Sequence, residues 1–152
     1  NSDITLSKER LIRAVSSGVE QTRAADLLVE WFEEHVCLKP KKRIIPLAHN
    51  WIFDSAFLKQ WMGPKSFDYL FDPRHRDTMT IAAFHNDYAE FDNRLELPFP
   101  KLKLSLLCNK LGIEQRRAHN ALEDAVVTAQ VYKRLLQGTF YSPRVVSNVP
   151  AS

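Results

Sequence analysis

The stretch RRAHNALEDAVVTAQVYKRLL, residues 116–136, has the apolar spacing of an amphipathic helix, but its first turn is unusual. His119 stands immediately before Asn120, and Asp124 follows where the core-facing stripe begins. Asn120 is a favourable N-cap residue, and Glu123 three positions later nearly completes a capping box. The pattern therefore predicts a helix that brings an imidazole and a carboxylate together at its N-terminal end.

The bulk properties of the chain are those of one globular domain with a single core. It has 152 residues, of which 45% are hydrophobic and 26% charged, and a net charge of +3. No apolar run approaches the roughly 18 residues of a membrane span, and we find no secretion signal. Two cysteines, Cys37 and Cys108, fit small buried hydrophobes in a reducing compartment, so we expect a cytoplasmic location.

Apolar periodicity and turn residues divide the chain into alternating helical and β-like segments, which indicates an α/β domain. The expected β-like segments are residues 43–49 and residues 77–83, the second being either a strand or a strand that runs into a helix. Residues 85–100 are expected to form an irregular insertion. Helices are expected at residues 5–18, 21–36, 50–63, 103–112 and 120–136. The basic run at 39–43 is read as a solvated loop, with a nuclear address or a phosphate contact as alternatives.

Two predicted helices begin with the same spacing of His, Asn and Asp, HNWIFD at 49–54 and HNALED at 119–124. If Asn50 and Asn120 are both N-caps, Asp54 and Asp124 each lie one turn inside, near the positive end of the helix dipole. Carboxylates that meet in space need a cation, and hard oxygen ligands suit Mg²⁺ or Mn²⁺. The alternative is that each aspartate only complements the dipole of its own helix.

These segments resemble a known enzyme family. LAHNWIFDSAFL (47–58) is similar to the second motif of the DEDD-type 3′–5′ exonucleases. RRAHNALEDAVVTAQVY (116–132) is similar to their third motif in its histidine (DEDDh, DnaQ-like) form. The linking pieces RDTMTIA (76–82) and LKLSLLCNKLGI (102–113) also resemble the family, as does the helix AADLLVEWFEEHV (24–36). The resemblance covers roughly residues 22–137.

The resemblance implies an α/β, ribonuclease H-like exonuclease fold and a two-ion site that holds Mg²⁺ or Mn²⁺ for phosphodiester hydrolysis. Asp54 and Asp124 would be metal ligands, and His119 would be the general base that takes a proton from water. Asn50 and Phe53 match positions near the terminal nucleotide of the substrate. A helix cap and a core aromatic are the alternative interpretations of these last two residues.

The family's first motif, a D-x-E pair on the first strand, is not found in this chain. SDITLSKE (2–9) contains Asp3 and Glu9, but their spacing is wrong and no apolar strand leads into them. The fold is therefore expected to lack its first strands here. Residues 1–137 are interpreted as the downstream portion of an exonuclease domain, and residues 138–152 as a flexible tail. A piece of a longer active protein is favoured over a degenerate relative, because the truncated sheet would expose a long edge.

The sequence thus predicts a metal-dependent 3′–5′ exonuclease that acts on 3′ ends of single-stranded DNA or RNA, or on fraying ends. No membrane partner is expected, and association with a polymerase or with a second copy is left open. The alternative from another class is a non-catalytic nucleic-acid-binding or scaffold module with a degenerate exonuclease fold. An RNA-directed trimming nuclease is a third interpretation, because DNA and RNA are told apart by contacts that the sequence does not reveal.

Overall fold

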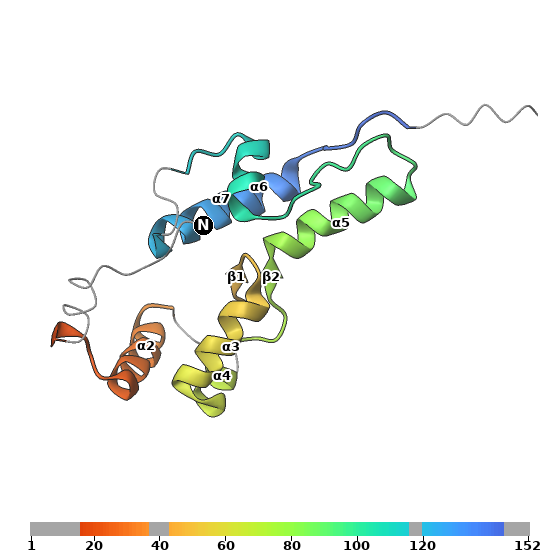
Figure 1. Ribbon diagram of the computed structural model, residues 1–152. Coiled ribbons are helices and arrows are strands. Elements are labelled where there is room, and N and C mark those ends of the chain that lie inside the picture. Colours follow the sequence, from red (N-terminus) through yellow and green to blue (C-terminus); the bar gives the residue numbers. More distant parts are fainter. Residues whose placement is uncertain (1–15, 37–42, 116–119, 145–152) are drawn as a thin grey trace, which may run out of the picture. The chain divides into compact units, whose positions relative to one another are not determined.

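The computed structural model of the protein describes residues 16–36, 43–115 and 120–144 (Figure 1). The chain forms two compact units. One contains the described residues up to Arg43 together with Phe57–Leu70, and the other contains Ile44–Ala56 together with the described residues from Phe71 onward. Within the described part of the chain, none of the helices has both the length and the apolar character needed to cross a membrane.

The first unit is helical. Helix α2, Gln21–His35, confirms the helix predicted at 21–36, and Glu20 caps it by accepting the Arg23 amide. The later turns of α3, Trp51–Met62, also belong to this unit, where Trp61 Nε1 donates to the Gln21 carbonyl at 3.1 Å.

Helix α4, Pro64–Leu70, was not predicted. Gly63 follows α3 in the left-handed conformation (φ +79°), which agrees with the predicted end of this helix at residue 63. Pro64 then starts a new helix instead of ending the helical region, because the fixed φ of proline suits the first position of a helix. The Tyr69 hydroxyl donates to Glu33 at 2.8 Å and so ties α4 to α2 within this unit.

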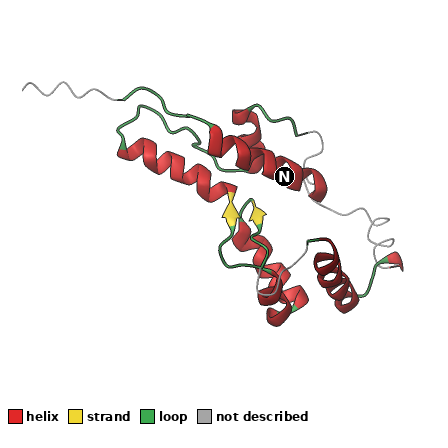
Figure 2. Cartoon of the chain, turned by 180° about the vertical axis from the view of Figure 1, so that it is seen from behind, coloured by secondary structure: helices red, strands yellow, loops and turns green. Residues whose placement is uncertain are grey.

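The second unit contains a two-stranded parallel sheet, drawn in yellow in Figure 2. Strand β1, Leu47–Ala48, pairs with β2, Arg76–Asp77, and an isolated bridge joins Ile44 to Phe71. The β-like segment predicted at 43–49 is therefore present in shortened form. Pro46 is compatible with it because the sheet uses only its carbonyl, which accepts from the Arg76 amide at 2.8 Å.

Helix α5, Thr78–Phe91, follows β2 directly, which confirms the prediction of a strand running into a helix. The prediction of an irregular insertion was wrong for residues 85–91, which are helical. Thr78, Ala82 and Ala89 form the buried side of α5. Because these buried residues are small and the exposed side carries large aromatic residues such as Phe84 and Phe91, the helical periodicity is weak in the sequence.

Helices α6, Leu104–Leu111, and α7, Ala121–Gln137, complete the core of the second unit. Both were predicted, as was the end of α6 at Gly112, which adopts φ +66°. Helix α7 packs against α5, α6 and β1. Burial of aliphatic side chains here stabilises the unit by about 1.5–3 kcal/mol each. The core cluster consists of Ala82, Phe99, Leu107, Cys108, Ile113, Val127, Val131 and Leu135.

The described residues after α7, 138–144, make specific contacts, and the predicted flexibility of this segment stays a prediction. The Phe140 ring packs on Phe99 with a centroid separation of 5.0 Å. Tyr141 and His85 are joined by a 2.7 Å hydrogen bond. Arg144 forms an ion pair with Asp92. Aromatic burial and these polar contacts hold the segment on α5, and the remainder of the predicted tail lies outside the described residues.

Candidate functional site: the N-terminal ends of α3 and α7

The α3 mouth, defined here as residues 49–54, is held by a carboxylate from another strand. Asp77 Oδ1 accepts from the Asn50 amide at 3.0 Å, and Asp77 Oδ2 accepts from the Trp51 amide at 2.7 Å. Asp77 Oδ1 also accepts from the Met79 amide at 2.9 Å and so caps α5. One buried carboxylate, 6% exposed, thus satisfies backbone donors at the starts of two helices.

Asn50 has a conformation that few side chains adopt. Its φ of +71° lies in the left-handed region, where asparagine is one of the few non-glycine residues found regularly. Its carbonyl accepts the first turn's bond from the Phe53 amide at 3.0 Å. The cap of α3 comes from Asp77, so the sequence-based interpretation of Asn50 as a side-chain N-cap was wrong.

His49 lies beside this carboxylate and is half-buried. His49 Nδ1 and Thr78 Oγ1 are 2.8 Å apart, and the Thr78 hydroxyl donates to the Ala48 carbonyl at 3.3 Å. Burial lowers the pKa of His49, and the charges of Asp77 and Asp54 and a hydrogen bond with the Leu102 backbone oppose this shift. The imidazole therefore connects β1, α5 and the segment before α6.

Asp54 lies one turn inside α3 on the exposed side of the helix. Desolvation by neighbouring protein atoms raises the pKa of its carboxyl group, the Asp77 charge raises it further, and His49 lowers it. The charge of a neighbouring carboxylate disfavours the charged form of a carboxyl group, and a bound cation would offset that effect. That Asp54 binds a cation stays a prediction.

Phe53 projects from the same turn and is 60% exposed. This exposure argues against the alternative that it is a core aromatic. An exposed aromatic ring beside an acidic group suits contact with a nucleobase or a sugar, and its predicted role in substrate binding stays a prediction.

The α7 mouth, defined as residues 120–124, is held by its own residues. Asn120 has an extended conformation (φ −98°), and its side chain accepts from the Glu123 amide at 3.1 Å, which confirms the predicted cap. Asp124 is half-buried, and its Oδ1 accepts from Gln115 Nε2 at 2.8 Å. Burial, and to a smaller extent the charge of Asp124, raises the pKa of the Cys108 thiol.

The structure therefore groups Asp54 with His49 and Asp77, and groups Asp124 with Gln115 and Cys108. Both groups belong to the second unit, where α7 packs against β1, the strand that leads into the α3 mouth. Among the described residues, no three His, Cys, Asp or Glu side chains, these two groups included, are placed so that they could hold a metal ion together. A metal shared by Asp54 and Asp124 stays a prediction. The candidate general base His119 lies outside the described residues.

Asp77 is the residue that sequence reasoning missed. The aspartate directly before the helical run TMTIAA is a good N-cap signal for α5. Its reach to the α3 mouth is set by the pairing of Ala48 with Asp77 across the sheet, and no local pattern encodes that contact.

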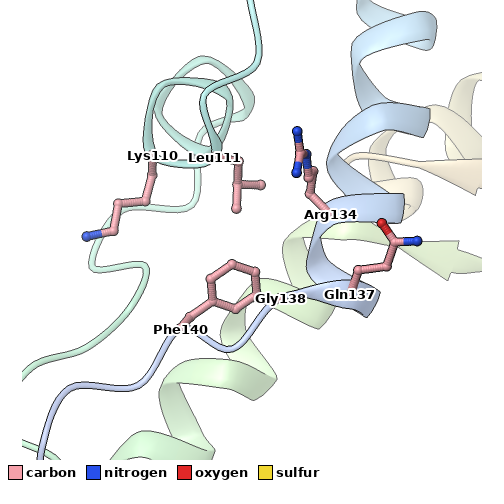
Figure 3. A pocket seen from close by; sticks show the side chains of 6 residues that line it. All are labelled: Lys110, Leu111, Arg134, Gln137, Gly138 and Phe140. Atoms are coloured by element: carbon pink, nitrogen blue, oxygen red, sulfur yellow. The ribbon is translucent and has the colours of Figure 1, made fainter.

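A separate hollow of about 220 Å³ lies at the C-terminal ends of α6 and α7 (Figure 3). Its lining residues are Lys110, Leu111, Arg134, Gln137, Gly138 and Phe140. The two cations stand in the last turns of their helices, where they complement the negative ends of the helix dipoles. The hollow contains none of the predicted site residues.

Comparison with known proteins gives two similar relatives. The chain is 32% identical over 93 residues to DNA polymerase III PolC-type from Thermotoga petrophila, and equally to the protein of the same name from Thermotoga maritima. The matched segment is 61% of this chain but only 6% of each relative, so the chain corresponds to a small part of their length. No family model and no solved structure matches the chain.

Proposed function

We propose that this chain carries part of the catalytic domain of a metal-dependent 3′–5′ exonuclease with a ribonuclease H-like fold. The observation that carries the proposal is the α3 mouth. There the exposed carboxylate of Asp54 stands beside a buried aspartate and a half-buried histidine, and its pKa is raised. The similarity to relatives named as DNA polymerases supports a role on nucleic acid.

Asp54 and Asp124 would supply carboxylate ligands to bound Mg²⁺ or Mn²⁺. The described residues provide too few ligands for a complete site, so the remaining ones would come from outside the described ranges. When bound, the ions would activate water and stabilise charge on the leaving oxygen.

The chain's own residues have distinct parts in this proposal. The His119 imidazole would accept the proton of the attacking water, because its ordinary pKa of about 6.5 lies near neutral pH. Phe53 and Asn50 would contact the terminal nucleotide. Gln115 orients Asp124 through its hydrogen bond to Oδ1.

The experiment is a nuclease assay on the longest natural chain that contains residues 1–152. A 5′-labelled single-stranded oligonucleotide, in DNA and RNA forms, is incubated with Mg²⁺, Mn²⁺ or EDTA. We expect a ladder of products shortened from the 3′ end that EDTA abolishes. His119→Ala should lower kcat by roughly 10²–10⁴, whereas Asp124→Asn should also raise the metal concentration needed.

Asp87→Asn is the matched control, since Asp87 is exposed on α5 and should leave the rate unchanged. Cleavage in EDTA, or His119→Ala and Asp124→Asn variants with the parent rate, would overturn the proposal.

The similarity to relatives named as DNA polymerases also fits one other candidate, a non-catalytic nucleic-acid-binding module. That candidate predicts that the oligonucleotide binds to the protein and is recovered intact under every metal condition.

A further inference from the structure

We propose that Asp77 is a positioning residue that fixes the conformation of the α3 mouth and thereby places Asp54 for its ligand. This inference rests on the proposed function, because it assumes that Asp54 belongs to the working site. Asp77 itself is buried and directed at backbone amides, so it acts through α3.

Three backbone amides converge on the Asp77 side chain. The amides of Asn50, Trp51 and Met79 all donate to one carboxylate at distances of 2.7–3.0 Å. Bonds from amides to an ionised carboxylate are roughly twice as strong as neutral ones. A cap for α5 alone needs only the Met79 bond. The other two bonds fasten a helix that begins 26 residues earlier in the sequence.

The hydrogen bonds to Asp77 hold Asn50 in an uncommon backbone conformation. Asn50 has φ +71°, a region that persists when surrounding contacts determine it. Its amide is held by Asp77, and its carbonyl accepts the Phe53 amide. The direction of the first turn of α3, from which Asp54 projects, follows from this fixed residue.

Asp77 and Thr78 also link the α3 mouth to the rest of the unit. Asp77 is the last residue of β2 and lies opposite Ala48 in the sheet. Thr78, the next residue, hydrogen-bonds His49 and Ala48. The β1–α3 turn is thus attached to the β2–α5 junction at consecutive positions. Substitution of a residue that positions a metal ligand commonly lowers metal affinity by roughly 10- to 100-fold.

Two variants separate positioning from capping. Asp77→Ser keeps a side-chain oxygen that can cap α5 through Met79 but is too short to reach the α3 amides. Asp77→Asn keeps an oxygen for Asn50 and Met79 but turns an amide group toward the Trp51 N–H. Asp87→Asn on α5 is the charge control. Val131→Ala in the core controls for lost stability.

The first readout is amide hydrogen exchange in the ¹⁵N-labelled chain. In Asp77→Ser we expect Asn50 and Trp51 to exchange about tenfold faster or more, because each loses a hydrogen bond, while Met79 stays protected. In Asp77→Asn the faster exchange should be confined to Trp51. Parent-like exchange at Asn50 and Trp51 in Asp77→Ser would overturn the inference.

The second readout is line broadening by Mn²⁺. In the parent, Mn²⁺ should broaden signals around Asp54, and Asp77→Ser should raise the required concentration roughly 10- to 100-fold. Asp87→Asn and Val131→Ala should match the parent. If Asp77→Ser matches it too, the positioning inference falls and the proposed function stands. If the parent shows no broadening at Asp54, the proposed metal site falls, and exchange alone decides whether Asp77 holds the α3 mouth.

Discussion

The sequences at the α3 mouth and the α7 mouth, HNWIFD and HNALED, share the spacing of His, Asn and Asp, yet their contacts differ. At the α7 mouth, Asn120 is extended and caps its own helix through the Glu123 amide. At the α3 mouth, Asn50 is left-handed and the cap arrives from Asp77 on another strand. Asparagine at the same motif position therefore acts as a side-chain hydrogen-bond acceptor at the α7 mouth and as a left-handed turn residue at the α3 mouth.

The difference shows that local contacts fix the start of one helix in this unit and non-local contacts fix the start of the other. The α7 mouth depends on residues three positions apart, so its geometry follows from the sequence of the helix itself. The α3 mouth depends on the sheet register that brings Ala48 beside Asp77. A carboxylate placed by a non-local contact also alters its surroundings electrostatically, because the charge of Asp77 helps to raise the pKa of Asp54.

The largest effect should come from Asp77→Ala. This change leaves three amides without their acceptor, two of them at the α3 mouth. Buried donors that lose a partner cost about 1–3 kcal/mol each, and partial access to water reduces the total. We expect the free energy of unfolding, measured by urea titration, to fall by about 2–4 kcal/mol. A loss of about 0.5 kcal/mol would mean that the α3 mouth does not depend on Asp77.

The equivalent change at the α7 mouth should be milder. Asn120→Ala removes one local cap, and such losses typically cost about 1 kcal/mol. The same urea titration measures it, and Asn120→Gly, which should cost only a few tenths of a kcal/mol, is the matched control. A cost for Asn120→Ala as large as that for Asp77→Ala would contradict the distinction between a locally held and a remotely held mouth.

Substitution of Asn50 tests the conformational difference directly. Asn50→Ala places at φ +71° a residue that rarely adopts the left-handed conformation. This should lower the free energy of unfolding by up to about 1 kcal/mol. Asn50→Gly should be nearly neutral because glycine adopts this conformation freely. Thermal unfolding of both variants measures the contrast. If Ala and Gly at this position unfold at the same temperature, the left-handed conformation is not what Asn50 provides.

The extent to which sequence predicted this fold follows the same division. Helices α2, α3, α6 and α7 were predicted because their stripes and stop signals, such as Gly63 and Gly112, are local. Helix α4 and the second half of α5 were missed. In α4 a proline starts the helix, and in α5 the buried side consists of small residues such as Ala82 and Ala89.

The candidate site was predictable to a similar degree. Asp54 and Asp124 lie in the first turns of their helices as the spacing predicted, and the cap by Asn120 was identified correctly. The role of Asp77 and the involvement of His49 and Thr78 could not be read from local sequence. These contacts depend on the pairing of two short strands 29 positions apart in register, Leu47 with Arg76 and Ala48 with Asp77.

The smallest expected effect is a pH dependence that belongs to the α3 mouth. Burial lowers the pKa of His49 in the folded chain below its ordinary value, so the unfolded chain binds more protons as the pH falls below about 6.5. The contribution of His49 to stability is therefore complete above that pH and is lost as the pH falls through the folded pKa. The slope is at most about 1.4 kcal/mol per pH unit. In His49→Asn, which retains a polar group near Thr78, this part of the slope should vanish.

The raised pKa of Asp54 acts in the opposite direction and at lower pH. The contribution of Asp54 to stability is present below the ordinary carboxyl pKa and is lost as the pH rises through the folded pKa. Urea titrations of the parent and of His49→Asn from pH 5 to 8 should therefore give a difference that is constant above about pH 7 and changes below it. A difference that is flat over the whole range would show that His49 is not the group that the α3 mouth holds neutral.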